Sequence, residues 1–174
     1  MSIQVGQKAP HFSAQALVDG EIRQVSLADY SGRWVVLFFY PEDFTFICPT
    51  EITEFADHKQ EFEKLNGAVL GCSTDGVYVH KAWANTPAIN RVNYPLLADR
   101  DQSISRNFGV LLEDKGIALR GTFIIDPEGV LRYQLVNDLS VGRSTAEVLR
   151  VLQALQLGEL CPASWKPGQK TLGR

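Results

Sequence analysis

The sequence is poor in cysteine and histidine, which excludes two kinds of scaffold. Its 174 residues include three histidines and three cysteines, Cys48, Cys72 and Cys161. An odd and small number of cysteines in a chain of this length argues against a disulfide scaffold, and no two of them form a Cys-x-x-Cys motif. The histidines lie apart from the cysteines without the spacing of metal ligands, so we expect no structural zinc site.

The sequence also lacks a membrane-spanning stretch and a run of basic residues. Its longest apolar run, residues 34–40, is far shorter than the roughly 18 residues that a membrane span needs. Residues 1–20 contain no apolar segment of signal-peptide length. The 17 basic and 20 acidic residues give a net charge of -3, which argues against a nucleic-acid partner. We therefore expect a cytoplasmic protein with no membrane or nucleic-acid partner.

What the sequence does contain predicts an α/β fold. Residues 34–40 are continuously apolar and rich in β-branched and aromatic side chains, which is typical of a strand buried on both faces. A helix is predicted from Pro49, which suits a first helical position, to Asn66–Gly67. Its apolar residues recur at the helical period: Ile52, Phe55, Phe62 and Leu65.

Further strands and helices alternate along the chain. Strands are predicted at 68–73, 94–98, 122–126 and 130–136, and helices at 77–84, at 103–108 and from Ser144, with Glu147 completing a capping box, to Gly158. A turn at 126–129 pairs the last two strands as a hairpin, so the central sheet is expected to be mixed and flanked by helices. Residues before 30 show no strong period, although Gly20 indicates a turn. We expect one domain, 1–158, followed by an extended C-terminal arm, 159–174.

Cys48 is the most informative residue. It lies after the carboxyl end of the buried strand and at the start of the predicted helix, where open α/β sheets place their ligands. The partial positive charge and free N–H groups of a helix start stabilise a thiolate. The alternative is a cysteine that only fills the core. A strand, a loop and a helix that begins with cysteine resemble the thioredoxin fold.

The residues around Cys48 favour the reactive interpretation. Pro41, Thr45 and Cys48 form the pattern Pro-x-x-x-Thr-x-x-Cys, which is the signature of peroxiredoxins. The longer string Asp-Phe-Thr-Phe-Ile-Cys-Pro-Thr-Glu resembles the typical two-cysteine subgroup, which includes the peroxidase component of bacterial alkyl hydroperoxide reductase. Three more stretches resemble the same subgroup in the expected order: 120–126, 141–144 and 158–165.

The resemblance implies a thiol-dependent hydroperoxide reductase with a thioredoxin-like fold. Cys48 becomes the peroxidatic cysteine, which attacks a hydroperoxide and becomes a sulfenic acid. Arg120 is implied to lie near the thiol and to bind the peroxide oxygens. Thr45 is implied to orient the peroxide, with helix-start N–H groups as further donors, and Pro41 to shield the site. The resemblance implies no metal or organic cofactor.

Several of these residues also allow ordinary structural interpretations. Glu51 and Arg143 match supporting residues of the family. However, Glu51 could simply be an acid in a first helical turn, and Arg143 a solvated residue before a helix cap. Arg120 could be a surface arginine at a strand edge, and Thr45 a loop or cap hydroxyl.

Cys161 is the candidate resolving cysteine. It lies in the tail, where a mobile thiol can attack a sulfenic sulfur to form a disulfide. In the resembled subgroup this disulfide joins two subunits of a homodimer, often within a ring of dimers, and thioredoxin or a flavoprotein disulfide reductase reduces it. The sequence leaves open whether the link is within or between chains. A spare thiol that packs near Trp165 is the alternative.

The remaining residues of interest have structural interpretations. Cys72 and Trp83 are expected in the core. His58 and His80 are expected on the surface or on a helix face.

Two departures from sensitive members of the family concern over-oxidation. Residues 86–93 lack the Gly-Gly-Leu-Gly cluster of those members, and the chain ends without their Tyr-Phe pair. These features slow the unfolding that precedes disulfide formation. Our hypothesis is therefore that this chain resists oxidation of Cys48 to the sulfinate.

Three other functions are compared with this one. A Cys-x-x-Cys disulfide oxidoreductase is excluded because position 51 is Glu. A cysteine hydrolase needs a histidine base, and no matching Cys/His pattern is present. A ring-forming holdase chaperone remains open as a secondary role.

Overall fold

The computed structural model describes residues 3–174 and forms two compact units, one up to Arg143 and one from Ser144 to Arg174. The first unit contains a seven-stranded sheet in the order β2-β1-β5-β4-β3-β8-β9. Its strands are β1 (Ser13–Val18), β2 (Glu21–Ser26), β3 (Trp34–Phe39), β4 (Gly67–Ser73), β5 (Leu96–Ala98), β8 (Arg120–Ile125) and β9 (Leu131–Asn137). A separate ribbon pairs β6 (Leu111–Leu112) with β7 (Ile117–Ala118).

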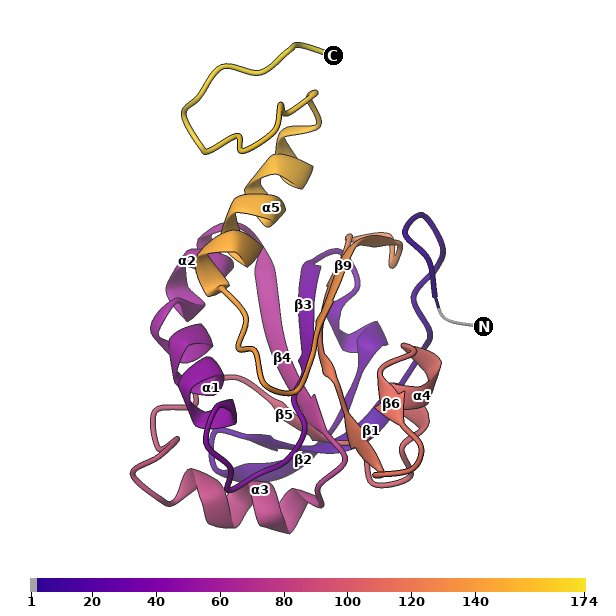
Figure 1. Ribbon diagram of the computed structural model, residues 1–174, viewed down its shortest axis with the longest axis vertical. Coiled ribbons are helices and arrows are strands. Elements are labelled where there is room, and N and C mark those ends of the chain that lie inside the picture. The colour runs from indigo at the N-terminus through magenta and orange to yellow at the C-terminus, as the bar shows by residue number, and fades with distance from the viewer. Residues whose placement is uncertain (1–2) are drawn as a thin grey trace. The chain divides into compact units, whose positions relative to one another are not determined.

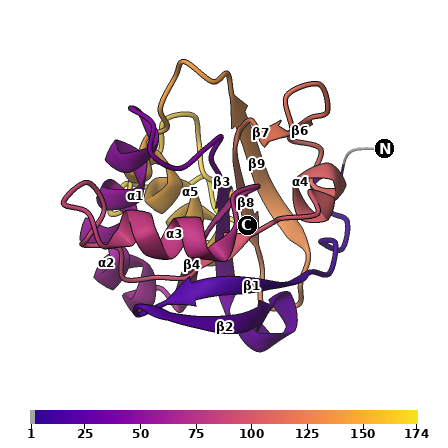
Figure 2. The ribbon, with the colours of Figure 1, turned by 90° about the horizontal axis from the view of Figure 1, so that it is seen from below.

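The helices of the first unit cover both faces of this sheet. They are η1 (Leu27–Tyr30), α1 (Cys48–Asp57), α2 (Lys59–Lys64), α3 (Val77–Ala84) and α4 (Ser103–Asn107). Figures 1 and 2 show α1 and α2 on one side of the sheet and α4 on the other. Strand β3 pairs in parallel with β4 and antiparallel with β8, so the predicted mixed α/β sheet is confirmed.

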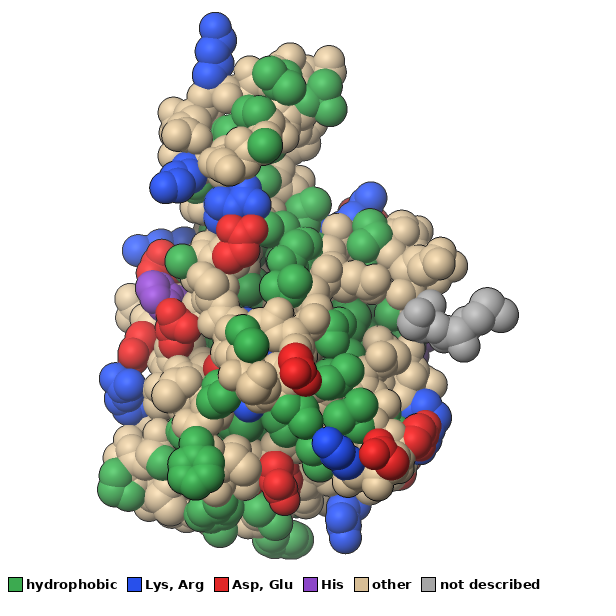
Figure 3. All heavy atoms as spheres, in the orientation of Figure 1, with side chains coloured by type: hydrophobic (Ala, Val, Ile, Leu, Met, Phe, Trp, Pro, Cys, Tyr) green, Lys and Arg blue, Asp and Glu red, His purple; other side chains and the backbone are tan. Residues whose placement is uncertain are grey.

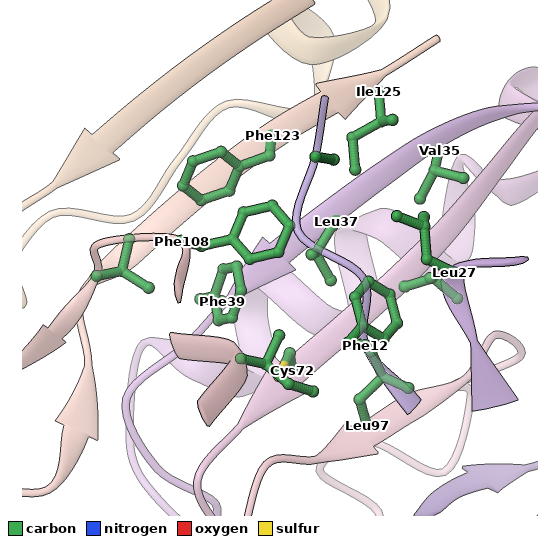
Figure 4. Packing of buried hydrophobic residues seen from close by; sticks show 14 of the residues in the cluster. Phe12, Leu27, Val35, Leu37, Phe39, Cys72, Leu97, Phe108, Phe123 and Ile125 are labelled. Carbon is green, nitrogen blue, oxygen red and sulfur yellow. The ribbon is translucent and has the colours of Figure 1, made fainter. Parts of the chain in front are cut away.

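Strand β3 is buried on both faces, as its continuous apolar run predicts. On one face Phe39 meets Phe108 and Phe123, with ring centroids 5.5 and 5.6 Å away (Figure 4). On the other face Phe38 stacks on Phe55 of α1 at 4.4 Å. The alternation of a strand sends neighbouring side chains to opposite sides, so both layers of helices pack on β3. Cys72 belongs to the same buried cluster as Phe39, Phe108 and Phe123, which confirms its predicted core position.

Two local predictions differ from the structure. The helix predicted from Pro49 to Asn66 is broken at His58, whose φ of -96° and ψ of 2° are not helical, and it becomes α1 and α2. Buried residues continue across the break, which is why the apolar period gave no sign of it. The weakly patterned N-terminal region forms the hairpin β1–β2, with Asp19 (φ 50°) and Gly20 (φ 80°) in the predicted turn.

The second unit consists of α5 (Thr145–Leu157) and the tail. The Ser144 hydroxyl accepts the Glu147 N–H at 3.3 Å, which is one half of the predicted capping box. The Glu147 carboxylate pairs with Arg150 and does not complete it. The tail is not simply extended, because Leu160 donates to the Gly173 carbonyl and accepts from the Leu172 N–H. These bonds close it into a loop.

The surface carries charged side chains of both signs. On the face shown in Figure 3, acidic and basic side chains are interspersed. Among the described residues, no helix has the length and apolar character to cross a membrane.

Candidate active site

Cys48 is the first residue of α1, and its side chain has no exposed surface. The preceding residue, Ile47, is the N-cap and provides no side-chain cap. The N–H groups of Thr50 and Glu51 both donate to the Ile47 carbonyl, and Pro49 has no N–H. Those two main-chain donors are therefore occupied within the turn, and the role of helix-start N–H groups in binding a ligand stays a prediction.

Arg120, the first residue of β8, reaches the Cys48 sulfur. Its Nη1 atom donates to Cys48 Sγ at 3.4 Å and to Glu51 Oε2 at 2.8 Å, and its Nε donates to the Leu139 carbonyl at 2.8 Å. The residue is 4% exposed. Arg120 is therefore a buried site residue, and its interpretation as a surface arginine is wrong.

Glu51 joins Arg120 to a second buried arginine, Arg143. Glu51 Oε1 accepts the main-chain N–H and the Nε of Arg143, at 3.0 and 2.8 Å. Arg143 also donates to the Phe39 carbonyl at 2.6 Å and to the Gly121 carbonyl at 2.7 Å. The alternative of a solvated Arg143 is wrong, and Glu51 is a first-turn acid that also pairs with two arginines.

The buried charges around Cys48 are unbalanced. Two guanidinium groups, Arg120 and Arg143, share the single carboxylate of Glu51. Buried charges are costly unless they are paired, so the cluster favours one more negative charge beside it. The Cys48 sulfur, the hydrogen-bond acceptor of Arg120, lies at that place. The arrangement can therefore hold a nucleophilic sulfur next to a fixed cationic donor.

The loop before Cys48 carries Pro41 and Thr45. Pro41 is buried, and the Thr45 hydroxyl donates to the Glu42 carbonyl at 2.8 Å. Between them, Phe44 has a φ of 57°, which is a rare and strained conformation for an aromatic residue. The Phe44 ring lies 5.8 Å from that of Trp83, which is buried as predicted.

Sequence reasoning missed a buried polar network behind this loop. His80 of α3 is fully buried, so its predicted surface placement is wrong, although it does lie on a helix face. Its Nδ1 lies 2.7 Å from Asp43 Oδ2 and its Nε2 lies 3.0 Å from the Leu97 carbonyl. The Tyr40 hydroxyl donates to Asp43 Oδ1 at 2.8 Å. The spacing of Val77, His80 and Trp83 on one helical face was the available signal.

Burial and charge shift the pKa values in this network. Burial raises the pKa of Tyr40 well above its usual value, and the Asp43 carboxylate adds to this. Burial also raises the pKa of Asp43. Burial opposes protonation of His80, but the hydrogen bond and charge of Asp43 outweigh it and raise the His80 pKa.

Cys161 belongs to the second unit and is partly exposed. Its Sγ lies 4.0 Å from the Ala154 carbonyl of α5, which is a weak contact. The tail around it is also held by Arg150, which donates to the Trp165 carbonyl at 2.9 Å. Residues 3–174 contain no group of three or more His, Cys, Asp or Glu side chains arranged to hold a metal ion.

Comparison with known proteins shows the family. The model of the AhpC/TSA family matches residues 5–134. Mouse Peroxiredoxin-2 is 55% identical over 177 residues, covering 97% of this chain and 89% of that protein. Thioredoxin peroxidase of Echinococcus granulosus is 54% identical over 179 residues, covering 98% and 93%.

A solved structure agrees with these sequence matches. The reduced 2-Cys peroxiredoxin of Plasmodium vivax superimposes with a TM-score of 0.93 at 40% identity, covering 95% of this chain and 91% of that one. The likeness therefore extends over the strands and helices that bring Arg120 to Cys48. The chain belongs to the AhpC/TSA family as a typical two-cysteine peroxiredoxin, a thiol peroxidase whose peroxidatic residue is Cys48.

Proposed function

We propose that Cys48 reduces hydrogen peroxide and organic hydroperoxides with Arg120 and Thr45 as its partners, and that Cys161 resolves the product. The observation that carries this proposal is the hydrogen bond from Arg120 Nη1 to Cys48 Sγ, made while the same nitrogen is held by Glu51. A peroxide that displaces this bond meets both a nucleophile and a donor.

The first step transfers one oxygen atom to sulfur. The Cys48 thiolate attacks one peroxide oxygen and the O–O bond breaks. The electron pair of that bond leaves on the second oxygen, which takes a proton to become water or an alcohol. The sulfur forms a bond to the attacked oxygen, which keeps its hydrogen, and becomes a sulfenic acid. The Arg120 guanidinium stabilises the charge on the leaving oxygen, because it is a fixed donor in a site that excludes water.

Thr45 and Pro41 take supporting roles at the entrance. The Thr45 hydroxyl donates to the Glu42 carbonyl in this state, so it must rotate away from Glu42 to donate to a peroxide. Pro41 has no N–H to compete for the peroxide, and its fixed φ stiffens the loop between β3 and α1.

Glu51 and Arg143 position Arg120. Glu51 holds Arg120 by its Oε2 atom and Arg143 by its Oε1 atom. Arg143 in turn donates to carbonyls at the end of β3 and in β8, at Phe39 and Gly121. The guanidinium that faces the sulfur is thus connected to two strands of the sheet, and this reduces its freedom to move when charge develops.

The second step forms a disulfide. The Cys161 thiol, once deprotonated, attacks the Cys48 sulfenic sulfur, an S–S bond forms, and the hydroxyl leaves as water. Because the Cys48 side chain is fully buried, the start of α1 must open first. Local opening of a helix end requires far less free energy than global unfolding.

We propose that the disulfide joins two subunits of a homodimer. Strand β9 lies at one edge of the sheet and exposes Leu135 and Val136. A strand at a sheet edge that exposes apolar side chains is suited to pairing with a second copy. A separate exposed apolar set, Phe44, Tyr78 and Val79, supports further assembly into a ring of dimers.

The reductant and the cellular location complete the proposal. A relative of this chain is named thioredoxin peroxidase. We propose thioredoxin, or a flavoprotein disulfide reductase, as the reductant of the Cys48–Cys161 disulfide. The cytoplasmic location and the boundary between a domain at 1–158 and an arm at 159–174 stay predictions. Cell fractionation tests the location, and limited proteolysis tests the boundary.

One experiment tests the cycle. Reduced protein is mixed with one equivalent of hydrogen peroxide, peroxide loss is followed, and samples are run on non-reducing gels. Cys48→Ser and Cys161→Ser are compared with wild type, and Cys72→Ser is the matched control. Fast peroxide loss that is absent in Cys48→Ser is expected. A dimer band is expected in wild type and Cys72→Ser, and in neither of the other variants.

Other outcomes contradict specific parts of the proposal. Fast peroxide loss without a dimer band contradicts the proposed intersubunit disulfide. A dimer band that persists in Cys161→Ser contradicts the role of Cys161 as the resolving thiol. The absence of peroxide loss in wild type contradicts the activity itself.

A further inference from the structure

The burial of Cys48 raises the question of how far α1 opens. A second thiol reaches the fully buried Cys48 sulfur only when the chain around it moves. This inference rests on the proposed function, in which Cys161 attacks the sulfenic acid of Cys48. The first turn of α1 is held by side-chain ion pairs and the second half by hydrogen bonds to its backbone. This difference determines how far along the helix unwinding extends.

The first turn of α1 is attached through side chains that face the active site. Its N-cap, Ile47, provides no side-chain cap. Glu51 ties the turn to Arg120 and Arg143. These contacts surround the reacting sulfur, and opening of the turn must separate Glu51 from both arginines.

The second half of α1 is attached through its backbone. The Tyr94 hydroxyl donates to the Ile52 carbonyl at 2.7 Å, and Asn93 Nδ2 donates to the Ala56 carbonyl at 3.3 Å. Both donors come from the segment that leads into β5. In an α-helix the Ile52 carbonyl also accepts the N–H of the residue four positions later, so Tyr94 adds a second bond to a helical carbonyl.

Tyr94 is itself held firmly. It is 4% exposed, and its ring meets the edge of Phe38 at 5.9 Å. Phe38 in turn stacks on Phe55 of α1. Burial raises the pKa of Tyr94 well above its usual value, so its hydroxyl keeps the proton that it donates. The hydroxyl is therefore a fixed donor, and its hydrogen bond restrains α1 at the Ile52 carbonyl.

We propose that Tyr94 is a positioning residue that stops the unwinding of α1 at Ile52. Opening is confined to residues 48–51, which releases Cys48 while the rest of the helix stays on the sheet. The remaining helix then serves as the template on which the first turn refolds after reduction. This returns the Cys48 sulfur to Arg120 in each cycle.

Hydrogen exchange of wild type and Tyr94→Phe tests this role. If unwinding stops at Ile52, the amides of Thr50 and Glu51 lose protection in the oxidised wild type, while those of Ala56 and Asp57 keep it. Loss of the Tyr94 hydrogen bond is expected to speed exchange at Ala56 and Asp57 by about three- to tenfold, because one hydrogen bond no longer opposes wider opening. The experiment is done on the reduced and the oxidised protein.

The controls separate local restraint from general destabilisation. Tyr78→Phe removes a hydroxyl from a tyrosine that is 76% exposed, and it should change nothing at these amides. Leu70 of β4 reports global unfolding and gives the general loss of stability that removal of the hydrogen bond causes. The decisive comparison is the effect of oxidation: it should leave exchange at Ala56 and Asp57 unchanged in wild type and speed it in Tyr94→Phe. A rise at these amides that is the same in the reduced and the oxidised variant shows a purely structural role and overturns the proposal, and so does unchanged exchange at Ala56 and Asp57. The reduced-state comparison needs no peroxide, so its result stands even if the proposed catalytic cycle fails.

Discussion

The Nδ1 atom of His80 lies 2.7 Å from Asp43 Oδ2, and neither side chain has exposed surface. The other ring nitrogen of His80 faces the Leu97 carbonyl, which can only accept a hydrogen bond. The Tyr40 hydroxyl donates to the other Asp43 oxygen. Both ring nitrogens of His80 therefore face hydrogen-bond acceptors. A neutral histidine has only one N–H, so this arrangement favours the protonated form of His80. The loop that leads to Cys48 is thus anchored by a buried, protonated pair.

This pair predicts a pH-dependent stability. The folded-state pKa of His80 is raised, so its contribution is complete below the unfolded value of about 6.5 and is lost as the pH rises through the raised value. We expect the difference in the free energy of unfolding between wild type and His80→Gln to shrink from pH 6 to pH 9. Urea unfolding measures it, with His58→Gln as the control. A difference that is constant with pH contradicts the protonated pair.

Substitution of Glu51 should affect stability and chemistry together. Glu51→Gln leaves Arg120 and Arg143 without their buried carboxylate, and breaking a buried ion pair costs about 3 kcal/mol or more. We expect a loss of that size in urea unfolding and a slower reaction of Cys48 with peroxide, because Arg120 loses its orientation. Glu54→Gln, an exposed position in the same helix, is the control. Wild-type kinetics in Glu51→Gln would falsify the positioning role.

Cys72 should remain unreactive in the native protein. Burial raises its pKa well above the usual value, and the nearby Asp99 carboxylate adds to this, so the reactive thiolate is scarce. We expect iodoacetamide to label the partly exposed Cys161 of the reduced protein and to leave Cys72 unmodified until urea is added. Peptide mass spectrometry gives the extent of labelling at each cysteine. Labelling of native Cys72 at the rate of Cys161 contradicts this prediction.

The absence of a Gly-Gly-Leu-Gly cluster from residues 86–93 predicts resistance to over-oxidation. Disulfide formation should outrun attack by a second peroxide molecule, so Cys48 sulfinate should be scarce during turnover. Mass spectrometry of the protein cycling at sub-millimolar peroxide measures the sulfinate fraction. Abundant sulfinate under those conditions rejects the hypothesis. Cys161→Ser, which cannot resolve, is the positive control for sulfinate.

Local chemistry was readable from the residues alone. The apolar run at 34–40 indicates a strand buried on both faces because no polar side chain could face water. Pro49 and the acids after it indicate a helix start next to Cys48, whereas the reaction followed from the resemblance of the Pro41, Thr45 and Cys48 pattern to the signature of peroxiredoxins. These features depend on neighbours in the sequence, and the position of Arg120 beside Cys48 followed from the family resemblance.

Only the tertiary structure decided which distant groups meet. The spacing of Val77, His80 and Trp83 can indicate that His80 is buried, but no signal in the sequence places it against Asp43. The same holds for Tyr94 and the Ile52 carbonyl, 42 positions apart, since the partner is a main-chain atom that every residue has. The break at His58 also escaped prediction, because buried residues continue across it. Sequence periodicity reports which side chains avoid water, whereas the pairing of buried polar groups depends on how the strands and helices pack.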